Sequence, residues 1–289
     1  MLNNILLPID FTANTTYAVK QAIELVLVNG STIHLLHIVN ENRNAKKGTV
    51  DKLMPMPRDI TYHIKDSMKK LKEWKQAIEG TIAGTEVKIH LEEGQVHDTI
   101  INTAQKINAQ LIILGRERKA SFFSLTRPLS AEEISKLSGC PVLRVVHGAN
   151  NTKVQNIVVP IRYFIPNRKI ELLIIFSKLY RAKIHLVALE DRIWTGNGKE
   201  TALLDTYQIL KSKLTNRIEY HLLKGRNLPK TTLRYAESIG ADMVFVNPEV
   251  ETKLSMFTGK HINDLLEPKS KLKILYVEPY PAKYITNDN

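Results

Sequence analysis

Short apolar segments alternate with longer segments of helical periodicity along the first half of the chain. The apolar segments, rich in Ile, Leu and Val, predict five strands, near residues 4–9, 32–39, 86–92, 110–114 and 142–146. Between them, apolar residues recur every three or four positions and predict helices over residues 17–28, 65–78, 99–107 and 130–137. Apolar strands that alternate with helices are typical of a parallel sheet covered on both faces.

Two of these helices have recognisable ends. Gly30 follows the first helix and Gly139 the fourth, as expected of a glycine that adopts the left-handed conformation after a helix. Ser130 and Glu133 have the spacing of a capping box, in which the serine side chain accepts a hydrogen bond from the amide three residues later. We therefore expect the fourth helix to begin after Ser130 and to end at Gly139.

The chain also contains an internal repeat. The segment Asn4–Asp10 (NILLPID) is echoed by Asn156–Arg162 (NIVVPIR), and further echoes follow in the same order. They are Ile33–Leu35 with Ile184–Leu186, His90–Gly94 with His221–Gly225, Ala109–Gly115 with Ala241–Asn247, and Val142–Val145 with Ile274–Val277. Preserved order indicates a tandem duplication. We predict a first domain over residues 1–147 (copy one) and a second over 153–280 (copy two), joined by a polar linker.

The offset between the two copies falls from 151 to 131 residues after the second strand. Copy one is therefore expected to carry about 20 extra residues between its second and third strands.

Composition excludes several classes of protein. Hydrophobic residues make up 43% and charged residues 24% of the 289 residues, far from the values of a disordered chain. No apolar run approaches the roughly 18 residues that span a bilayer, and the N-terminus lacks the basic region and cleavage site of a signal peptide. The lone Cys140 excludes an internal disulfide. Together these features predict a cytoplasmic protein with no membrane partner.

Ligands of open parallel sheets bind at the carboxyl ends of the strands, where the strand order changes direction. This rule selects Asp10 after the first strand, residues 38–40 after the second, and the loop that begins at Gly115 after the fourth.

The strand-end motifs resemble those of the universal stress protein family. They are Pro8-x-Asp10, Leu36-His37-Ile38, Leu114-Gly115 and Cys140-Pro141-Val142-Leu143, and the resemblance extends over nearly the whole chain as two copies. It implies an α/β fold of two tandem Rossmann-like domains (HUP, or adenine nucleotide α-hydrolase-like), each a five-stranded parallel sheet flanked by about four helices. It also implies that the two copies pair with each other through their last strands.

Nucleotide-binding members of that family carry Gly-x2-Gly-x9-Gly-[Ser/Thr] after the fourth strand, where glycine amides and a hydroxyl contact phosphates. Gly115 matches the first glycine, but Arg118, Pro128 and Leu129 occupy the other three positions. Pro128 has no amide hydrogen and Leu129 no hydroxyl. Ser130 stands one residue late, and the capping box already explains it.

Other parts of the family's site are kept in copy one only. Asp10 matches the acid beside the adenosine, although a role as a cap or turn residue is equally compatible. Pro8 is expected to shape the strand end, and Ile38 matches an apolar position that contacts adenine. In copy two Arg162 replaces the acid and Asn247 the first glycine, so copy two is a degenerate site.

Basic residues could replace the missing amides in copy one, because Arg pairs well with phosphate. Those in question lie in the loop after the fourth strand: Arg116, Arg118, Lys119 and Arg127. A solvated basic loop is the simpler explanation and the favoured one.

No catalytic or metal signature is evident. The chain lacks a Gly-rich P-loop, His-Glu-x-x-His and Gly-x-Ser-x-Gly. Four histidines fall inside predicted strands at equivalent places of the two copies, and we expect them to be hydrogen-bonded structural side chains rather than ligands: His34, His90, His185 and His221.

The favoured hypothesis is a non-enzymatic universal stress protein with a degenerate nucleotide site, acting through a protein partner, a small ligand or further homo-oligomerisation. The first alternative is a protein that binds ATP or AMP in copy one through Asp10, Ile38 and Gly115, with Arg116, Arg118 and Ser130 near the phosphates. The second is a nucleic-acid-binding protein that uses the net charge of +12. The absence of an aromatic-interleaved basic motif makes this alternative the weakest.

Overall fold

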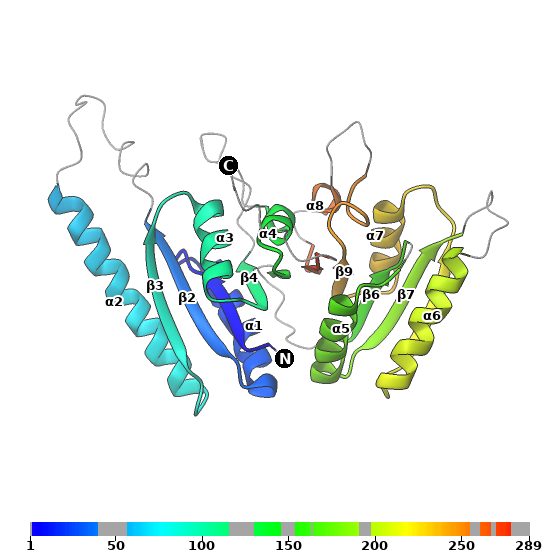
Figure 1. Ribbon diagram of the computed structural model, residues 1–289, viewed down its shortest axis with the longest axis horizontal. Helices are drawn as coiled ribbons and strands as arrows, with labels where there is room; N and C mark the ends of the chain where they lie inside the picture. The colour runs from blue at the N-terminus through cyan, green and yellow to red at the C-terminus, as the bar shows by residue number, and fades with distance from the viewer. Residues whose placement is uncertain are drawn as a thin grey trace, which may run out of the picture. The chain divides into compact units, whose positions relative to one another are not determined.

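The structure is a computed structural model that describes residues 2–39, 57–115, 130–145, 154–162, 164–190, 198–254, 261–266 and 270–278. The chain divides into two compact units, Met1–Cys140 and Pro141–Asn289, and each is built from a sheet with helices packed on it (Figure 1). The α/β class expected from the sequence is confirmed, with two tandem Rossmann-like folds.

The first unit alternates strands and helices. Its elements are β1 (Asn4–Pro8), α1 (Ala13–Asn29), β2 (Thr32–Val39), α2 (Pro57–Thr81), β3 (Val87–Glu93), α3 (Val96–Lys106), β4 (Leu111–Gly115) and α4 (Ala131–Ser138). Its strand order is β3-β2-β1-β4, with parallel pairing. Because crossovers between parallel strands are right-handed, the reversal of direction at β1 places α1 and α2 on one face of this sheet and α3 on the other.

The second unit repeats this topology. Its elements are β5 (Val142–Val145), β6 (Asn156–Pro160), α5 (Asn167–Tyr180), β7 (Lys183–Leu189), α6 (Gly198–Lys213), β8 (Ile218–Leu223), α7 (Leu228–Ser238), β9 (Met243–Val246), α8 (Ile262–Leu265) and β10 (Lys273–Tyr276). The order is β5-β10-β9-β6-β7-β8. Here β8-β7-β6-β9 reproduces the order of the first unit, and β5 pairs with β10 antiparallel, with Leu143 opposite Leu275.

The predicted strands of copy one are confirmed, whereas three of its helices begin earlier than predicted. α1 begins at Ala13 rather than at residue 17, α2 at Pro57 rather than at residue 65, and α3 at Val96 rather than at residue 99. The first turn of α1 is polar, with Asn14, Thr15 and Thr16 in sequence. Apolar periodicity marks a helix only where it faces the core, so it could not mark this turn.

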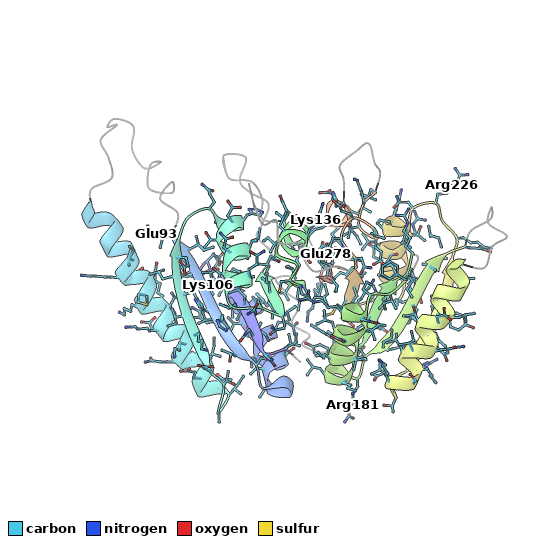
Figure 2. The ribbon with its side chains drawn as sticks, viewed as in Figure 1. Glu93, Lys106, Lys136, Arg181, Arg226 and Glu278 are labelled. Carbon is cyan, nitrogen blue, oxygen red and sulfur yellow. The ribbon has the colours of Figure 1, made fainter. Side chains whose placement is uncertain are left out.

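The predicted helix ends are also confirmed. The Ser130 hydroxyl accepts a hydrogen bond from the amide of Glu133 at 3.2 Å, and Gly139 ends α4 with a φ of 64°. In the second unit α5 ends instead at Arg181, which takes the left-handed conformation with a φ of 53° and extends its side chain into solvent (Figure 2). A glycine is therefore favoured at such an end but not required.

The helix after the second strand differs most in length between the copies. α2 has 25 residues, whereas its counterpart α6 has 16. This difference accounts for part of the extra length predicted in copy one, and residues 40–56 lie outside the described residues. Among the described helices, none is long and apolar enough to cross a membrane.

Candidate functional site

The carboxyl ends of β1, β2 and β4 meet in the first unit, because β1 pairs with both of the other strands. They bring together three of the predicted site positions: Pro8 at the end of β1, Ile38 near the end of β2, and Gly115 at the end of β4. Asp10 follows β1 directly and is exposed. Arg116 and Arg118, with the rest of the predicted basic loop, lie outside the described residues.

The carboxylate of Asp10 is engaged by its own turn. It accepts hydrogen bonds from the Thr12 amide at 2.9 Å, the Thr12 hydroxyl at 2.7 Å and the Thr15 hydroxyl at 2.7 Å. Burial raises the pKa of Asp10, but these hydrogen bonds outweigh that effect and hold the pKa below its usual value. Asp10 thus serves as the turn residue before α1, which was one of its two predicted roles.

An aromatic pair that the sequence did not reveal lies beside Asp10. His37, at the end of β2, donates from Nδ1 to the carbonyl of Ile9 at 2.8 Å, and its ring centroid is 4.4 Å from that of Phe11. The ammonium of Lys70, on α2, lies 5.6 Å from the Phe11 ring centroid. Phe11 adopts a φ of 59°, which is uncommon for an aromatic residue, so its ring is held at this strand end by a specific backbone turn.

Ser130, the last of the predicted site residues, is used by the fold. Its hydroxyl caps α4, and its amide donates to Nε2 of His97, on α3, at 3.2 Å. The proposed contact of Ser130 with a phosphate stays a prediction.

In copy two, the corresponding strand ends contain a buried ion pair. The ammonium of Lys169, on α5, lies 2.6 Å from the carboxylate of Glu251, and each side chain is 1% exposed. Lys169 also donates to the carbonyl of Pro160, the last residue of β6, at 3.2 Å. Glu251 accepts from the amide of Asn247, the residue after β9, at 2.7 Å. The pair therefore bridges the two central strands of this copy at their carboxyl ends.

Burial and pairing have opposite effects on the pKa values of the two charged side chains. Burial raises the pKa of Glu251 and lowers that of Lys169, while the contact between the two side chains opposes both shifts. Arg162, which replaces the acid of copy one, donates to the carbonyl of Val250 at 3.0 Å. The segment after β9 is thus tied to β6 and to α5 by side chains of the chain itself.

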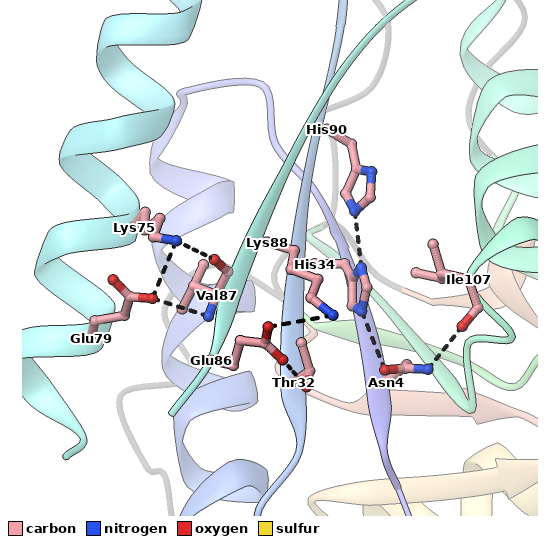
Figure 3. Close-up of polar contacts among 10 residues, drawn as sticks. All are labelled: Asn4, Thr32, His34, Lys75, Glu79, Glu86, Val87, Lys88, His90 and Ile107. Atoms are coloured by element: carbon pink, nitrogen blue, oxygen red, sulfur yellow. Dashed lines mark hydrogen bonds and ion pairs between the residues drawn. The ribbon is translucent and has the colours of Figure 1, made fainter. Parts of the chain in front are cut away.

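A second group of polar side chains lies near the amino ends of the strands, and copy one shows it in its simpler form (Figure 3). Asn4 donates from Nδ2 to the carbonyl of Ile107 at 2.8 Å, which turns its Oδ1 toward Nε2 of His34 at 3.2 Å. Because Nε2 of His34 must donate to this oxygen, its Nδ1 accepts, and it takes a hydrogen bond from Nε2 of His90 at 2.9 Å. Burial, assisted by the charges of His90 and Lys88, lowers the pKa of His34 to about 4.

Copy two keeps the asparagine and both histidines but connects them differently. His185 again places Nε2 on Asn156 Oδ1, at 3.1 Å, while its Nδ1 meets the hydroxyl of Tyr235 at 3.0 Å. The ring of His221 stacks on that of His185 with centroids 5.8 Å apart. The buried Nε2 of His221 has no hydrogen-bond partner.

The hydrogen bonding expected of the four strand histidines is therefore found for His34, His90 and His185, whereas the buried Nε2 of His221 has no hydrogen-bond partner. Within the described residues, His185, Glu219 and His221 form the one group whose possible metal-binding atoms all lie within 4.8 Å of one another. Their sequence spacing, Glu-x-His on one predicted strand, was the signal that could have revealed the group.

Comparisons with known proteins agree with the fold. A sequence model of the universal stress protein family matches residues 1–146, half of the chain. A universal stress protein of Synechocystis sp. is 28% identical over 151 residues, which cover 50% of this chain and 86% of that protein.

Solved structures extend the likeness to both copies. A universal stress protein from Archaeoglobus fulgidus matches 97% of this chain and 100% of its own, with a TM-score of 0.69 and 19% identity. The cytoplasmic domain of a prokaryotic cation chloride cotransporter matches 98% of each chain, with a TM-score of 0.57 and 10% identity. At these identities the likeness concerns the fold alone.

Proposed function

The chain belongs to the universal stress protein family, and from that premise we propose that it is a non-enzymatic stress-response protein in which the two copies have different tasks. Copy one presents the strand ends at which a small ligand or a protein partner binds. Copy two is a scaffold whose own strand ends are closed. The observation that carries this proposal is the buried Lys169–Glu251 pair.

The pair supports a closed second site for an electrostatic reason. Glu251 already places an anionic group on the amide of Asn247, the residue that corresponds to the first glycine of the nucleotide motif. A phosphate that bound there would have to displace this carboxylate and separate it from Lys169. Breaking a buried pair leaves an uncompensated charge, which costs about 3–5 kcal/mol. Nucleotide binding to copy two is therefore disfavoured.

The same reasoning leaves copy one as the place for a ligand. Within the described residues, the strand ends of copy one contain no buried ion pair of this kind, and Asp10 is exposed. The alternative function, binding of ATP or AMP, is accordingly proposed for copy one only. In that alternative the nucleotide contacts Asp10, Ile38 and Gly115, and its phosphates lie near Arg116, Arg118 and Ser130.

We also propose that the two copies associate through their last strands. The antiparallel pairing of β5 with β10 supports this, since β5 belongs to the sequence of copy one and β10 to that of copy two. Leu143 and Leu275 are opposite each other in this pairing and are fully buried. A cytoplasmic location remains part of the proposal.

Calorimetric titration of ATP and of AMP into the full chain tests the proposal. We expect no micromolar binding and no release of phosphate over hours. Micromolar binding that disappears in Asp10→Ala and in Arg118→Ala, but persists in the copy-two control Arg162→Ala, would establish the nucleotide-binding alternative instead. Tight RNA binding that weakens steeply with salt would favour the nucleic-acid alternative.

A further inference from the structure

Three potential metal ligands converge near the amino ends of β7 and β8. The register places His185 opposite Glu219, and Val187 opposite His221. Because alternate residues of a strand point to the same face, Glu219 and His221 share the face that His185 occupies on the neighbouring strand. The Oε2 atom of Glu219 lies 3.9 Å from Nδ1 of His185 and 3.6 Å from Nε2 of His221.

The hydrogen bonds around these side chains direct ligand atoms into the group. Asn156 Oδ1 accepts from Nε2 of His185 at 3.1 Å, so the lone pair of His185 is on Nδ1, which faces Glu219. An outer hydrogen bond of this type is what orients histidines that bind metals in proteins. His221 contributes Nε2, a buried ring atom without a hydrogen-bond partner.

Copy one provides a natural comparison for this group. It has the same two histidines, but Lys88 stands where Glu219 stands in copy two. There His34 and His90 hydrogen-bond directly to each other at 2.9 Å and use the nitrogen atoms that a cation would need. In copy two the hydroxyl of Tyr235 donates instead to Nδ1 of His185 at 3.0 Å and has to be displaced by a cation, whereas Nε2 of His221 has no hydrogen-bond partner.

We propose that His185 Nδ1, His221 Nε2 and the Glu219 carboxylate bind a divalent transition-metal cation, with Zn²⁺ as the best match to two imidazoles and one carboxylate. A water molecule completes four-coordination. This site lies at the opposite end of the strands from the Lys169–Glu251 pair, and it goes beyond the proposed function. No thiolate takes part, since the one cysteine of the chain, Cys140, is buried elsewhere.

Two basic side chains compete for Glu219 and limit the affinity. Lys183 lies 2.7 Å from Oε2 and Arg217 lies 2.9 Å from Oε1 of the carboxylate. A cation that binds Oε2 displaces Lys183, which is 28% exposed and can move into solvent, whereas Arg217 can stay on the other oxygen. We therefore expect reversible, micromolar binding rather than a permanently held structural ion.

Calorimetric titration of Zn²⁺ into the chelator-treated full chain tests this site, together with the visible absorption of added Co²⁺. We expect one equivalent to bind. Loss of an outer-shell partner alone weakens metal binding by about 10–100-fold, so Glu219→Gln and His221→Ala should each weaken it by at least about tenfold. The matched copy-one variant His90→Ala should leave the affinity unchanged.

Glu219→Gln decides the case if His221→Ala does not fold, because the Glu219 side chain is 28% exposed and the substitution preserves its shape. Absence of Zn²⁺ binding at millimolar concentration overturns the proposal. So does binding that persists unchanged in Glu219→Gln, or that falls equally in His90→Ala, since either result would place the ion elsewhere.

Discussion

The strand ends of the two copies differ in how their polar groups are satisfied. In copy one the exposed Asp10 carboxylate is held by Thr12 and Thr15, its neighbours in the chain. In copy two a buried ammonium from α5 meets a buried carboxylate from the segment after β9, 82 positions apart in sequence. The polar groups of one strand end are satisfied by local contacts and those of the other by long-range contacts. Duplicated sheets can therefore keep one topology while the polar groups at their strand ends are satisfied in different ways.

Removal of the Lys169 ammonium should have the largest effect on stability of the changes considered. In Lys169→Met the Glu251 carboxylate stays buried without its cation, so we expect a loss of about 3–5 kcal/mol in the free energy of unfolding, measured by urea denaturation. Lys70→Met is the matched control, because the Lys70–Asp66 contact is also 2.6 Å long but its side chains are 47% and 40% exposed. It should cost no more than about 1 kcal/mol. Equal losses would contradict the closed second site.

Substitution of the glycines that precede α3 and α7 should have the next largest effect on stability and should differ between the two copies. A Cβ on Gly225 would clash with Oγ1 of Thr231 and lie 3.0 Å from its Cγ2, so Gly225→Ala should cost toward the upper end of roughly 1–3 kcal/mol. Adding Thr231→Ala should restore most of the loss in thermal unfolding.

Gly94, the copy-one counterpart, has a φ of 140°, a conformation that side-chain-bearing residues rarely adopt. Gly94→Ala should therefore not be rescued by Thr99→Ala. Rescue in both copies would show that crowding, not the backbone, constrains Gly94.

The histidine network of copy one predicts a loss of stability in acid. The pKa of His34 is about 4 in the folded chain and about 6.5 when unfolded, so the unfolded chain binds the proton first. Stability should be complete above pH 6.5, fall as the pH drops below it, and level off below about 4. Between pH 7 and pH 5 we expect this residue to cost about 2 kcal/mol.

Urea denaturation at pH 7 and at pH 5, with His34→Gln as the control, measures the contribution of His34 to this loss of stability. The variant should show a smaller loss between the two conditions. An NMR titration that places the pKa of His34 near 6.5 would refute the buried, neutral ring.

The cap of α4 should have the smallest effect. Ser130→Ala removes the acceptor for the Glu133 amide and should cost about 1 kcal/mol in thermal unfolding, without any change in the heat of ATP addition. Asn227→Ala is the control in copy two, where Asn227 accepts from the amide of Lys230 at 3.0 Å and caps α7. An ATP affinity that falls in Ser130→Ala but not in Asn227→Ala would indicate that Ser130 contacts a phosphate.

Much of the fold was predictable because its signals are local. Apolar periodicity located the strands, Gly139 and Ser130 marked the ends of α4, and the repeated NILLPID and NIVVPIR segments indicated two copies. The candidate site was predictable only in part. The sequence selected the strand ends of the candidate site and showed that copy two lacks the nucleotide motif, but it could not show that the Lys169–Glu251 pair occupies those strand ends.

The sequence by itself determined the elements, their order and the duplication, since each depends on residues a few positions apart. The tertiary structure alone decided that Lys169 meets Glu251 and that His185 lies opposite Glu219. Such contacts depend on strand register and on burial, which bring distant residues together in a medium of low polarity. A charge or an imidazole acquires its partner, and hence its chemistry, only after the sheet has formed.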